Sequence, residues 1–118
     1  MSFSNKRDMY KQGDIIIVPY PFSDDLKKYK YRPAVIISNK KSNDLDEDVL
    51  ICPITSTIRE NEFSYQLKEK DTKEALPVQS EVRCNKIVTI RKSLIKTKFN
   101  HLKQQAILEI LQKVKSSF

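Results

Sequence analysis

The sequence predicts a small, mainly β domain: a curled barrel of short strands followed by one C-terminal helix. Several apolar runs rich in β-branched residues follow one another closely, without the helical segments that alternate with strands in a βαβ fold. Clear helical periodicity is confined to the region after residue 100. With 118 residues the chain is long enough to bury its own core, and we treat residues 1–118 as a single domain.

Each expected strand is a short run whose composition or alternation is typical of extended structure. In chain order the runs are DIIIVPY (14–20), PAVIISN (33–39), DVLICPIT (48–55), FSYQL (63–67) and SEVRCNKIVTI (80–90). The last run changes phase near Ile87, as a β-bulge would make it do.

The C-terminal helix is the clearest single element. Asn100 is a good N-cap residue, and Lys113 and Lys115 in the last turn suit the negative end of the helix dipole. The apolar face consists of Leu102, Ala106, Ile107, Ile110, Leu111 and Val114. We expect this face to pack on the barrel and assign it no chemical role.

Positive charge is concentrated near the C-terminus. Residues 1–82 carry 13 Lys and Arg against 14 Asp and Glu, whereas residues 83–118 carry nine against one, within a net charge of +7. This asymmetry favours a polyanionic partner, most simply a nucleic acid. A solvated basic face that keeps the protein soluble explains the charge equally well.

The scarcity of glycine and histidine excludes several classes of site. A Walker loop needs two glycines and a dinucleotide fingerprint three, whereas Gly13 is the only glycine. His101 is the only histidine, so the sequence offers no multi-histidine zinc site. The acidic run DLDED (44–48) lacks the turn glycine and the closing glutamate of a calcium loop, and we interpret it as a solvated turn. We therefore expect no metal and no cofactor.

The cysteines and the hydropathy pattern indicate a cytoplasmic protein. Cys52 and Cys84 lie in apolar, strand-like runs, which favours reduced core thiols over a disulfide. Pro19 and Pro21 interrupt the longest apolar run, which is far too short to span a membrane. Nothing near Met1 is typical of an export signal.

Two polar residues stand at the ends of expected strands. Arg32 precedes Pro33 at the entry to one apolar run, and a residue before proline favours extended backbone. Thr55 follows the apolar run ICPI (51–54) in a cluster of Thr and Ser. Taken alone, either residue is more typical of a solvated flank or a turn than of a functional site.

Four stretches, taken together, resemble the PemK/MazF family of toxins from bacterial type II toxin–antitoxin pairs. They are GDIIIVPYPFSD (13–24), YRPAVIIS (31–38), ICPITST (51–57) and LPVQSEVRCNKIVTIRKSLI (76–95). Each stretch is a weak signal, but the set follows the order and spacing of the family over nearly the whole chain.

The resemblance implies a barrel related to SH3 folds, of the CcdB/PemK type, and a homodimer. It also implies a sequence-selective endoribonuclease that cuts single-stranded RNA such as mRNA without a metal, and that is controlled by a cognate antitoxin. The toxin–antitoxin complexes of the family bind DNA. The functional arginine of the family, in its Arg-Pro motif, falls on Arg32, and its functional threonine falls on Thr55.

The chemistry of RNA supports these two positions independently. The 2′-hydroxyl can attack the adjacent phosphorus, and the enzyme must then stabilise negative charge on the phosphoryl oxygens. The guanidinium of Arg32 presents a planar fork of donors that fits those oxygens. Thr55 can donate a further hydrogen bond or orient Arg32. Arginine stays protonated near neutrality and is a poor base, so the acceptor of the 2′-hydroxyl proton stays open.

Further residues are candidates for contacts with RNA or for proton transfer. The candidate RNA-binding residues are Ser56, Lys28, Lys30, Arg83, Lys86 and Arg91. Asp24 and Asp25 are the carboxylates nearest to Arg32 in sequence and are candidate proton acceptors. The chain departs from many relatives at Asn85 and Arg91, where they often carry acidic residues, so the cleavage sequence cannot be transferred.

Two other classes of protein remain open from the sequence. A non-catalytic barrel that binds nucleic acid would keep the basic C-terminal third without needing Arg32 and Thr55 together. A poison of DNA gyrase like CcdB, which shares the barrel, would carry its decisive residues in the C-terminal helix and would cut no RNA.

Overall fold

The computed structural model describes residues 10–22 and 25–118, and within this part seven strands form one antiparallel sheet with a helix at the C-terminus. The mainly β fold class is therefore confirmed. The strands are β1 (Asp14–Phe22), β2 (Asp25–Ile36), β3 (Asp48–Thr55), β4 (Ser64–Gln66), β5 (Glu81–Arg83), β6 (Val88–Arg91) and β7 (Thr97–His101). The helices are α2 (Lys40–Leu45) and α3 (Gln104–Lys115), with short 3₁₀ turns at Glu69–Asp71 and Lys92–Leu94.

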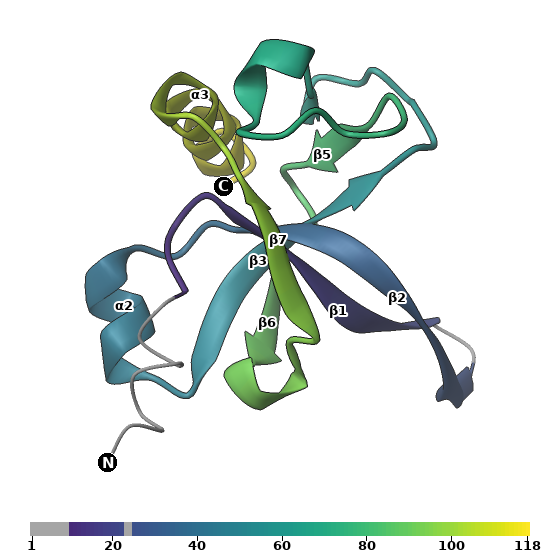
Figure 1. Cartoon of the computed structure of the whole chain (residues 1–118), viewed down its shortest axis with the longest axis vertical. Helices are drawn as coiled ribbons and strands as arrows, with labels where there is room; N and C mark the ends of the chain where they lie inside the picture. Colours follow the sequence, from purple (N-terminus) through teal and green to yellow (C-terminus); the bar gives the residue numbers. More distant parts are fainter. Residues whose placement is uncertain (1–9, 23–24) are drawn as a thin grey trace.

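Strand β3 connects the two halves of the sheet. The strand order is β4-β5-β3-β2-β1-β7, and β6 pairs with the first half of β3 while β5 pairs with its last two residues. In Figure 1, β7 crosses in front of β1 and β2, and α3 lies beside the end of the sheet that carries β5. The long β1–β2 hairpin projects away from this body.

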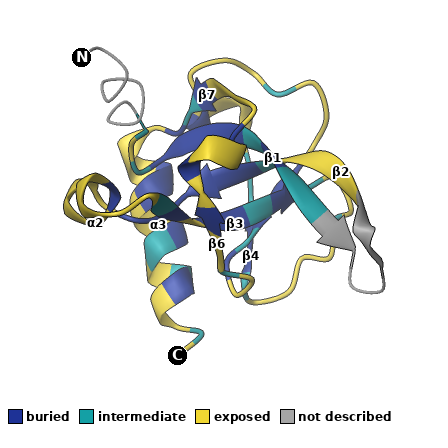
Figure 2. Ribbon diagram, turned by 90° about the horizontal axis from the view of Figure 1, so that it is seen from below, coloured by how far each residue is buried: buried dark blue, intermediate teal, exposed yellow. Residues whose placement is uncertain are grey.

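The alternation of side chains along the strands builds two apolar clusters on opposite faces of the sheet. One cluster packs under α3 and contains Ile15, Val35, Cys52, Ile54, Val82 and the helix residues Ala106, Ile107, Ile110 and Val114. The other contains Ile16, Val18, Ala34, Ile36, Ile51 and Ile90. Figure 2 shows the buried centre of the sheet and the exposed outer side of α3, as the helical periodicity predicts.

The single glycine lies where β1 begins and α3 approaches. Gly13 has a φ of 95°, and its backbone N–H donates to Ile36 while its carbonyl accepts from Leu102. A Cβ at this position would stand 2.3 Å from Cδ1 of Ile107. The position therefore requires glycine for both conformation and space.

Three sequence-based expectations about boundaries differ from the structure. Strand β2 begins before Pro33, so Arg32 lies within a strand rather than at its start. The run 80–90 is two strands, β5 and β6, separated by a turn at 84–85, and not one bulged strand. Asn100 belongs to β7 and is not the N-cap of α3, whose N-cap is Lys103.

Both cysteines are buried free thiols, as the sequence predicted. Burial raises the pKa of Cys52 to about 12 and that of Cys84 to about 11, so both stay protonated near neutrality. No helix in the described part of the chain is long and apolar enough to cross a membrane.

Candidate functional site

Arg32 and Thr55 line one open pocket of about 340 Å³. The antiparallel register explains why they meet. Ala34 of β2 pairs with Pro53 of β3, so alternation places Arg32 and Thr55 on the same face of the sheet, two residues beyond this pair in each strand. The pocket is lined by Tyr20, Arg32, Pro53, Ile54, Thr55, Thr57, Arg59, Arg83 and Lys86.

The side chain of Arg32 is exposed at the rim of the second apolar cluster. It pairs with Val18 of β1, and the next residues along β2, Pro33 and Ala34, pass into the core. The rim position leaves the guanidinium accessible to a ligand while the buried end of β2 fixes its backbone. A cation can therefore stand directly before an apolar run without being buried.

Thr55 is the last residue of β3, and its hydroxyl oxygen accepts a hydrogen bond from the backbone N–H of Thr57 at 3.0 Å. This contact holds the chain in a bend at Ser56 and Thr57. Because the oxygen already accepts, the hydroxyl proton is the part of Thr55 that can donate into the pocket.

A buried carboxylate beneath the pocket organises its far wall. Glu81 is fully buried and pairs with Thr55 across β5 and β3. Burial by itself would raise the pKa of Glu81, but hydrogen bonds hold it below its usual range, so the group is ionised. The donors are Gln66 Nε2 at 2.7 Å, Ser64 Oγ at 2.9 Å, and the backbone N–H groups of Arg59 at 3.1 Å and Glu60 at 3.2 Å.

The same carboxylate holds a cation at the pocket. Nε of Arg83 lies 3.6 Å from Glu81 Oε2, and the side chain of Arg83 is largely buried. Arg83, Arg59 and Lys86 line the pocket together with Arg32, and no described lining residue carries a carboxylate. The walls are thus strongly cationic and suited to a phosphate backbone.

The other predicted site residues are more dispersed. Lys30 pairs with Tyr20 and shares the face of Arg32, and Ser56 is exposed beside Thr55, but neither lines the pocket. Arg91 lies at the opposite end of β3, where its Nε donates to Asp48 at 3.1 Å. The side chains of Lys28 and Asp25, and the whole of Asp24, lie outside the described residues.

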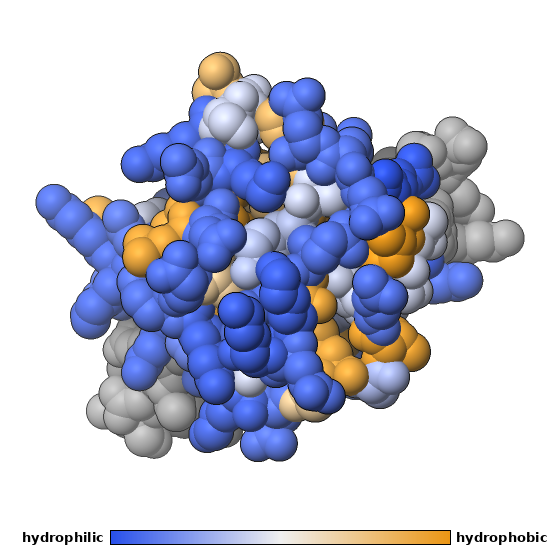
Figure 3. Space-filling model, turned by 90° about the horizontal axis from the view of Figure 1, so that it is seen from above, coloured by the Kyte–Doolittle hydropathy of each residue, from blue (hydrophilic) through white to orange (hydrophobic). Residues whose placement is uncertain are grey.

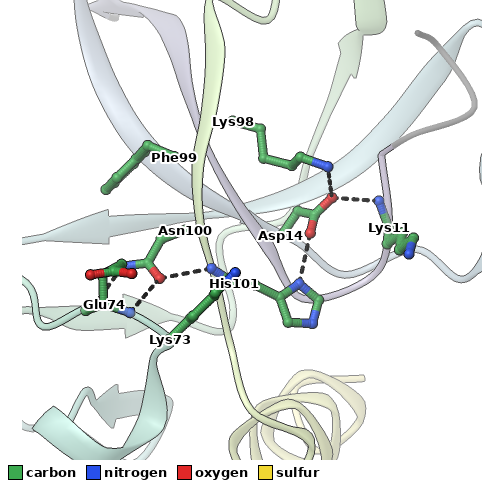
Figure 4. Close-up of a pocket in the computed structure, with 8 residues that line it drawn as sticks. All are labelled: Lys11, Asp14, Lys73, Glu74, Lys98, Phe99, Asn100 and His101. Carbon is green, nitrogen blue, oxygen red and sulfur yellow. Dashed lines mark hydrogen bonds and ion pairs between the residues drawn. The ribbon is translucent and has the colours of Figure 1, made fainter.

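A second pocket, of about 490 Å³, surrounds Asp14 and His101 (Figure 4). The buried carboxylate of Asp14 lies 2.7 Å from His101 Nδ1 and 3.6 Å from Lys98 Nζ, and it accepts from the N–H of Lys11 at 2.7 Å. The amide of Asn100 exchanges two hydrogen bonds with the backbone of Glu74. These contacts tie β7 to β1 and to the loop before β5, which is a structural role.

Sequence reasoning did not single out Tyr20, Arg59 and Glu81 as site residues. Glu81 lies in a run whose alternation identifies only a strand, and its buried position depends on β4 and on the loop after Thr55. Tyr20 has the composition of an ordinary strand residue. In the described part of the chain, no group of three or more His, Cys, Asp or Glu is placed to hold a metal ion.

Comparisons with known proteins agree with this architecture. Residues 11–118 match the family model described as PemK-like, MazF-like toxin of type II toxin–antitoxin system. None of the curated proteins matches the sequence.

Solved structures are similar in fold. An endoribonuclease in complex with its cognate antitoxin from Mycobacterial species has a TM-score of 0.74 and 20% identity, over 91% of this chain and 92% of that chain. A MazE–MazF structure from Deinococcus radiodurans has a TM-score of 0.72 and 18% identity, over 90% of this chain and 92% of that chain.

Proposed function

The chain belongs to the PemK-like, MazF-like toxins of type II toxin–antitoxin systems, and from this premise we propose that it is an endoribonuclease that cleaves single-stranded RNA. One observation carries the proposal. Arg32 and Thr55, which come from different strands, line one pocket together with three further cations. Similar folds include proteins named as endoribonucleases.

The proposed reaction is attack of a 2′-hydroxyl on the adjacent phosphorus, with departure of the 5′-oxygen, which takes up a proton from Arg32 or from water as it leaves. Negative charge then grows on the non-bridging oxygens, where a guanidinium and a hydroxyl are suitable donors. Arg32 stabilises this charge, and Thr55 donates a further hydrogen bond. The cationic groups Arg59, Arg83 and Lys86 bind the flanking phosphates.

The described lining residues include no carboxylate or histidine, and we propose that the reaction proceeds without a bound metal. Asp24 and Asp25 remain the proposed acceptors of the 2′-hydroxyl proton. We also propose that residues 1–118 act as one domain in the cytoplasm, where RNA is present and the two thiols stay reduced.

The test is incubation with a defined single-stranded RNA in EDTA, with the product ends mapped. We expect cleavage with 2′,3′-cyclic phosphate and 5′-hydroxyl ends. Arg32→Ala should reduce cleavage by about a hundredfold or more, as loss of one transition-state donor does. Lys41→Ala, which removes an exposed cation on α2, is the control and should cleave normally.

Other results would contradict the proposal. Cleavage of the matching DNA, or activity lost in EDTA and restored by magnesium, would mean a different chemistry. RNA binding without any cleavage would favour the non-catalytic barrel, and inhibition of gyrase without RNA cleavage would favour the CcdB-like alternative.

The proposed protein partner is a cognate antitoxin, and a similar fold has been solved in complex with one. We propose that an acidic antitoxin segment occupies the cationic pocket and competes with RNA, so that both interactions weaken as salt rises. Competition between uncleaved RNA and the antitoxin segment on Arg32→Ala protein measures this. Independent binding of both ligands would show that inhibition acts at a distance.

A further inference from the structure

The pocket contains the hydroxyl of Tyr20, which has no role in the reaction proposed above. The hydroxyl oxygen of Tyr20 is buried, and within the described residues nothing hydrogen-bonds it. Buried hydroxyls normally have a partner, since leaving one unpaired costs stability. An unpaired hydroxyl in the wall of a ligand pocket therefore suggests that the missing partner is the ligand.

The strand register directs Tyr20 toward the reacting groups. Tyr20 lies two residues beyond Val18 in β1, and Val18 pairs directly with Arg32. The period of two in a strand places Val18, Tyr20 and Arg32 on the same face of the sheet. Tyr20 and Arg32 both line the pocket that ends at Thr55.

The surroundings determine what this hydroxyl can do. Burial, with a smaller contribution from Cys52, raises the pKa of Tyr20 well above its ordinary value, so the phenol keeps its proton near neutrality. A neutral phenol is a hydrogen-bond donor and a poor base. The hydroxyl of Tyr20 therefore suits a hydrogen bond to an anionic oxygen of a ligand.

A second donor in the same pocket lacks a hydrogen bond within the described residues. Nε of Arg83 is buried and makes no hydrogen bond to a described residue, although Glu81 lies 3.6 Å away. Two buried donors that make no hydrogen bond within the described residues, in a pocket whose described lining residues carry no carboxylate, are an arrangement that a phosphate group would complete.

We propose that Tyr20 is a catalytic residue whose hydroxyl donates a hydrogen bond to a non-bridging oxygen of the scissile phosphate, beside Arg32. This inference rests on the proposed function and adds a third donor to Arg32 and Thr55. No proton is transferred in this role: the phenol stays neutral and stabilises the charge that develops on the oxygen.

The competing explanation is that the side chain of Tyr20 only packs against the second apolar cluster and takes no part in the reaction. Its ring contacts the second apolar cluster, and a tyrosine used only for packing would serve as well as phenylalanine. Tyr20→Phe keeps the ring and removes only the unpaired oxygen, so it separates the two roles. Because no hydrogen bond to a described residue is lost, this variant should be at least as stable as the wild type.

The experiment compares the wild type, Tyr20→Phe and Tyr65→Phe in cleavage of a defined RNA and in thermal unfolding. Tyr65 is the matched control, because its buried hydroxyl donates to Asp71 at 3.0 Å and lies outside the pocket. We expect Tyr20→Phe to lower kcat by about a hundredfold without loss of Tm. Tyr65→Phe should lower Tm and leave kcat unchanged.

A phosphorothioate substrate tests contact with the phosphate itself. Sulfur replaces one non-bridging oxygen at the cleavage site, and the two diastereomers are cleaved separately. Sulfur is a poor acceptor, so the wild type should cleave one diastereomer more slowly, and Tyr20→Phe should reduce this difference. Structural damage would slow both diastereomers equally.

The outcomes separate this inference from the proposed function. If the wild type cleaves RNA and Tyr20→Phe cleaves it as fast, the role of Tyr20 is wrong and the proposed function stands. A slow Tyr20→Phe variant with an unchanged diastereomer difference also overturns the contact. If the wild type cuts no RNA, both proposals fail together.

Discussion

Glu81 lies beneath the pocket and makes five described contacts with other residues of the chain. One carboxylate oxygen accepts from the backbone of Arg59 and Glu60, which fixes the loop after Thr55. The other carboxylate oxygen lies near Arg83 and accepts from Ser64. We therefore assign Glu81 as a positioning residue for the cationic wall.

Glu81→Gln should destabilise the protein by roughly 2 kcal/mol at pH 7, because an amide cannot accept all of these bonds. The folded state holds the pKa of Glu81 below the ordinary value of 4.5, so its stabilisation is complete above that pH. It is lost as the pH falls through the lower, folded-state pKa. Urea unfolding at pH 7 and at acid pH should show a difference between wild type and variant that shrinks on acidification. An equal difference at both pH values would mean that Glu81 is not ionised when buried.

His101 allows a direct comparison of the two polar pockets. If the Asp14–His101 pair is structural, His101→Gln should lower Tm modestly and leave RNA cleavage near the wild-type rate. Arg32→Ala should leave Tm near the wild-type value and strongly reduce RNA cleavage. A folded His101→Gln protein without activity would move the reaction to the pocket of Figure 4.

The sequence indicates Arg32 and Thr55 as a pair only through the family resemblance, and it does not reveal Tyr20 or Glu81. The Arg-Pro pair and the strand-ending threonine are visible locally. The buried hydroxyl of Tyr20 and the buried charge of Glu81 arise only when strands β1 to β5 are assembled, because their surroundings come from distant segments.

At the scale of elements, the pattern of apolar residues predicts β1, β3 and β4 well. It fails for segments that are extended only because they pair with a neighbouring strand. The first half of β2 carries Tyr29, Lys30 and Tyr31, which are exposed and give no apolar signal, yet they pair with β1. Asn100 is a strong capping residue, but it lies in β7 because residues 97–101 pair with β1. Tertiary pairing outweighs local preference in both cases.

Gly13→Ala tests the junction of β1 with α3. We expect a loss of about 2 kcal/mol, since alanine must adopt a positive φ and its Cβ would meet Ile107. Ile107→Val removes the atom in closest contact. In a double-mutant cycle it should relieve much of the steric part of the loss, although Cγ1 of residue 107 would still lie 2.9 Å from the new Cβ, and leave the conformational part. An alanine variant as stable as the wild type would show that α3 can move away from β1.

At the scale of the whole molecule, an apolar groove beside α3 is the surface on which we expect the homodimer that the family resemblance implies. The face in Figure 3 is mostly hydrophilic, with limited apolar patches. By contrast, the groove has a volume of about 830 Å³ and is lined by Ile37, Leu50, Ile87, Leu108, Leu111 and Phe118 together with polar residues at its edge. Leu108 is 52% exposed and Phe118 92% exposed, and with the other apolar residues of the groove they form a contiguous surface of the kind that marks a protein–protein contact.

Leu108→Glu should therefore shift the protein from dimer to monomer, because a carboxylate cannot be buried in an apolar interface. Light scattering over a range of concentrations measures the change. Val78→Glu is the control, since Val78 is exposed outside the groove. A wild-type protein that is monomeric at all concentrations would contradict the dimer.

The pairing of β7 with β1 has a consequence for synthesis of the protein. One edge of β1 pairs with β2, but the other edge pairs with β7, near the C-terminus, and the side chain that packs on Gly13 belongs to α3. A ribosome that has made the first half of the chain therefore carries both Arg32 and Thr55 without a finished sheet to align them. The toxin should become active only near release, so that the message being translated is spared. Nascent chains stalled before residue 97 should leave RNA intact.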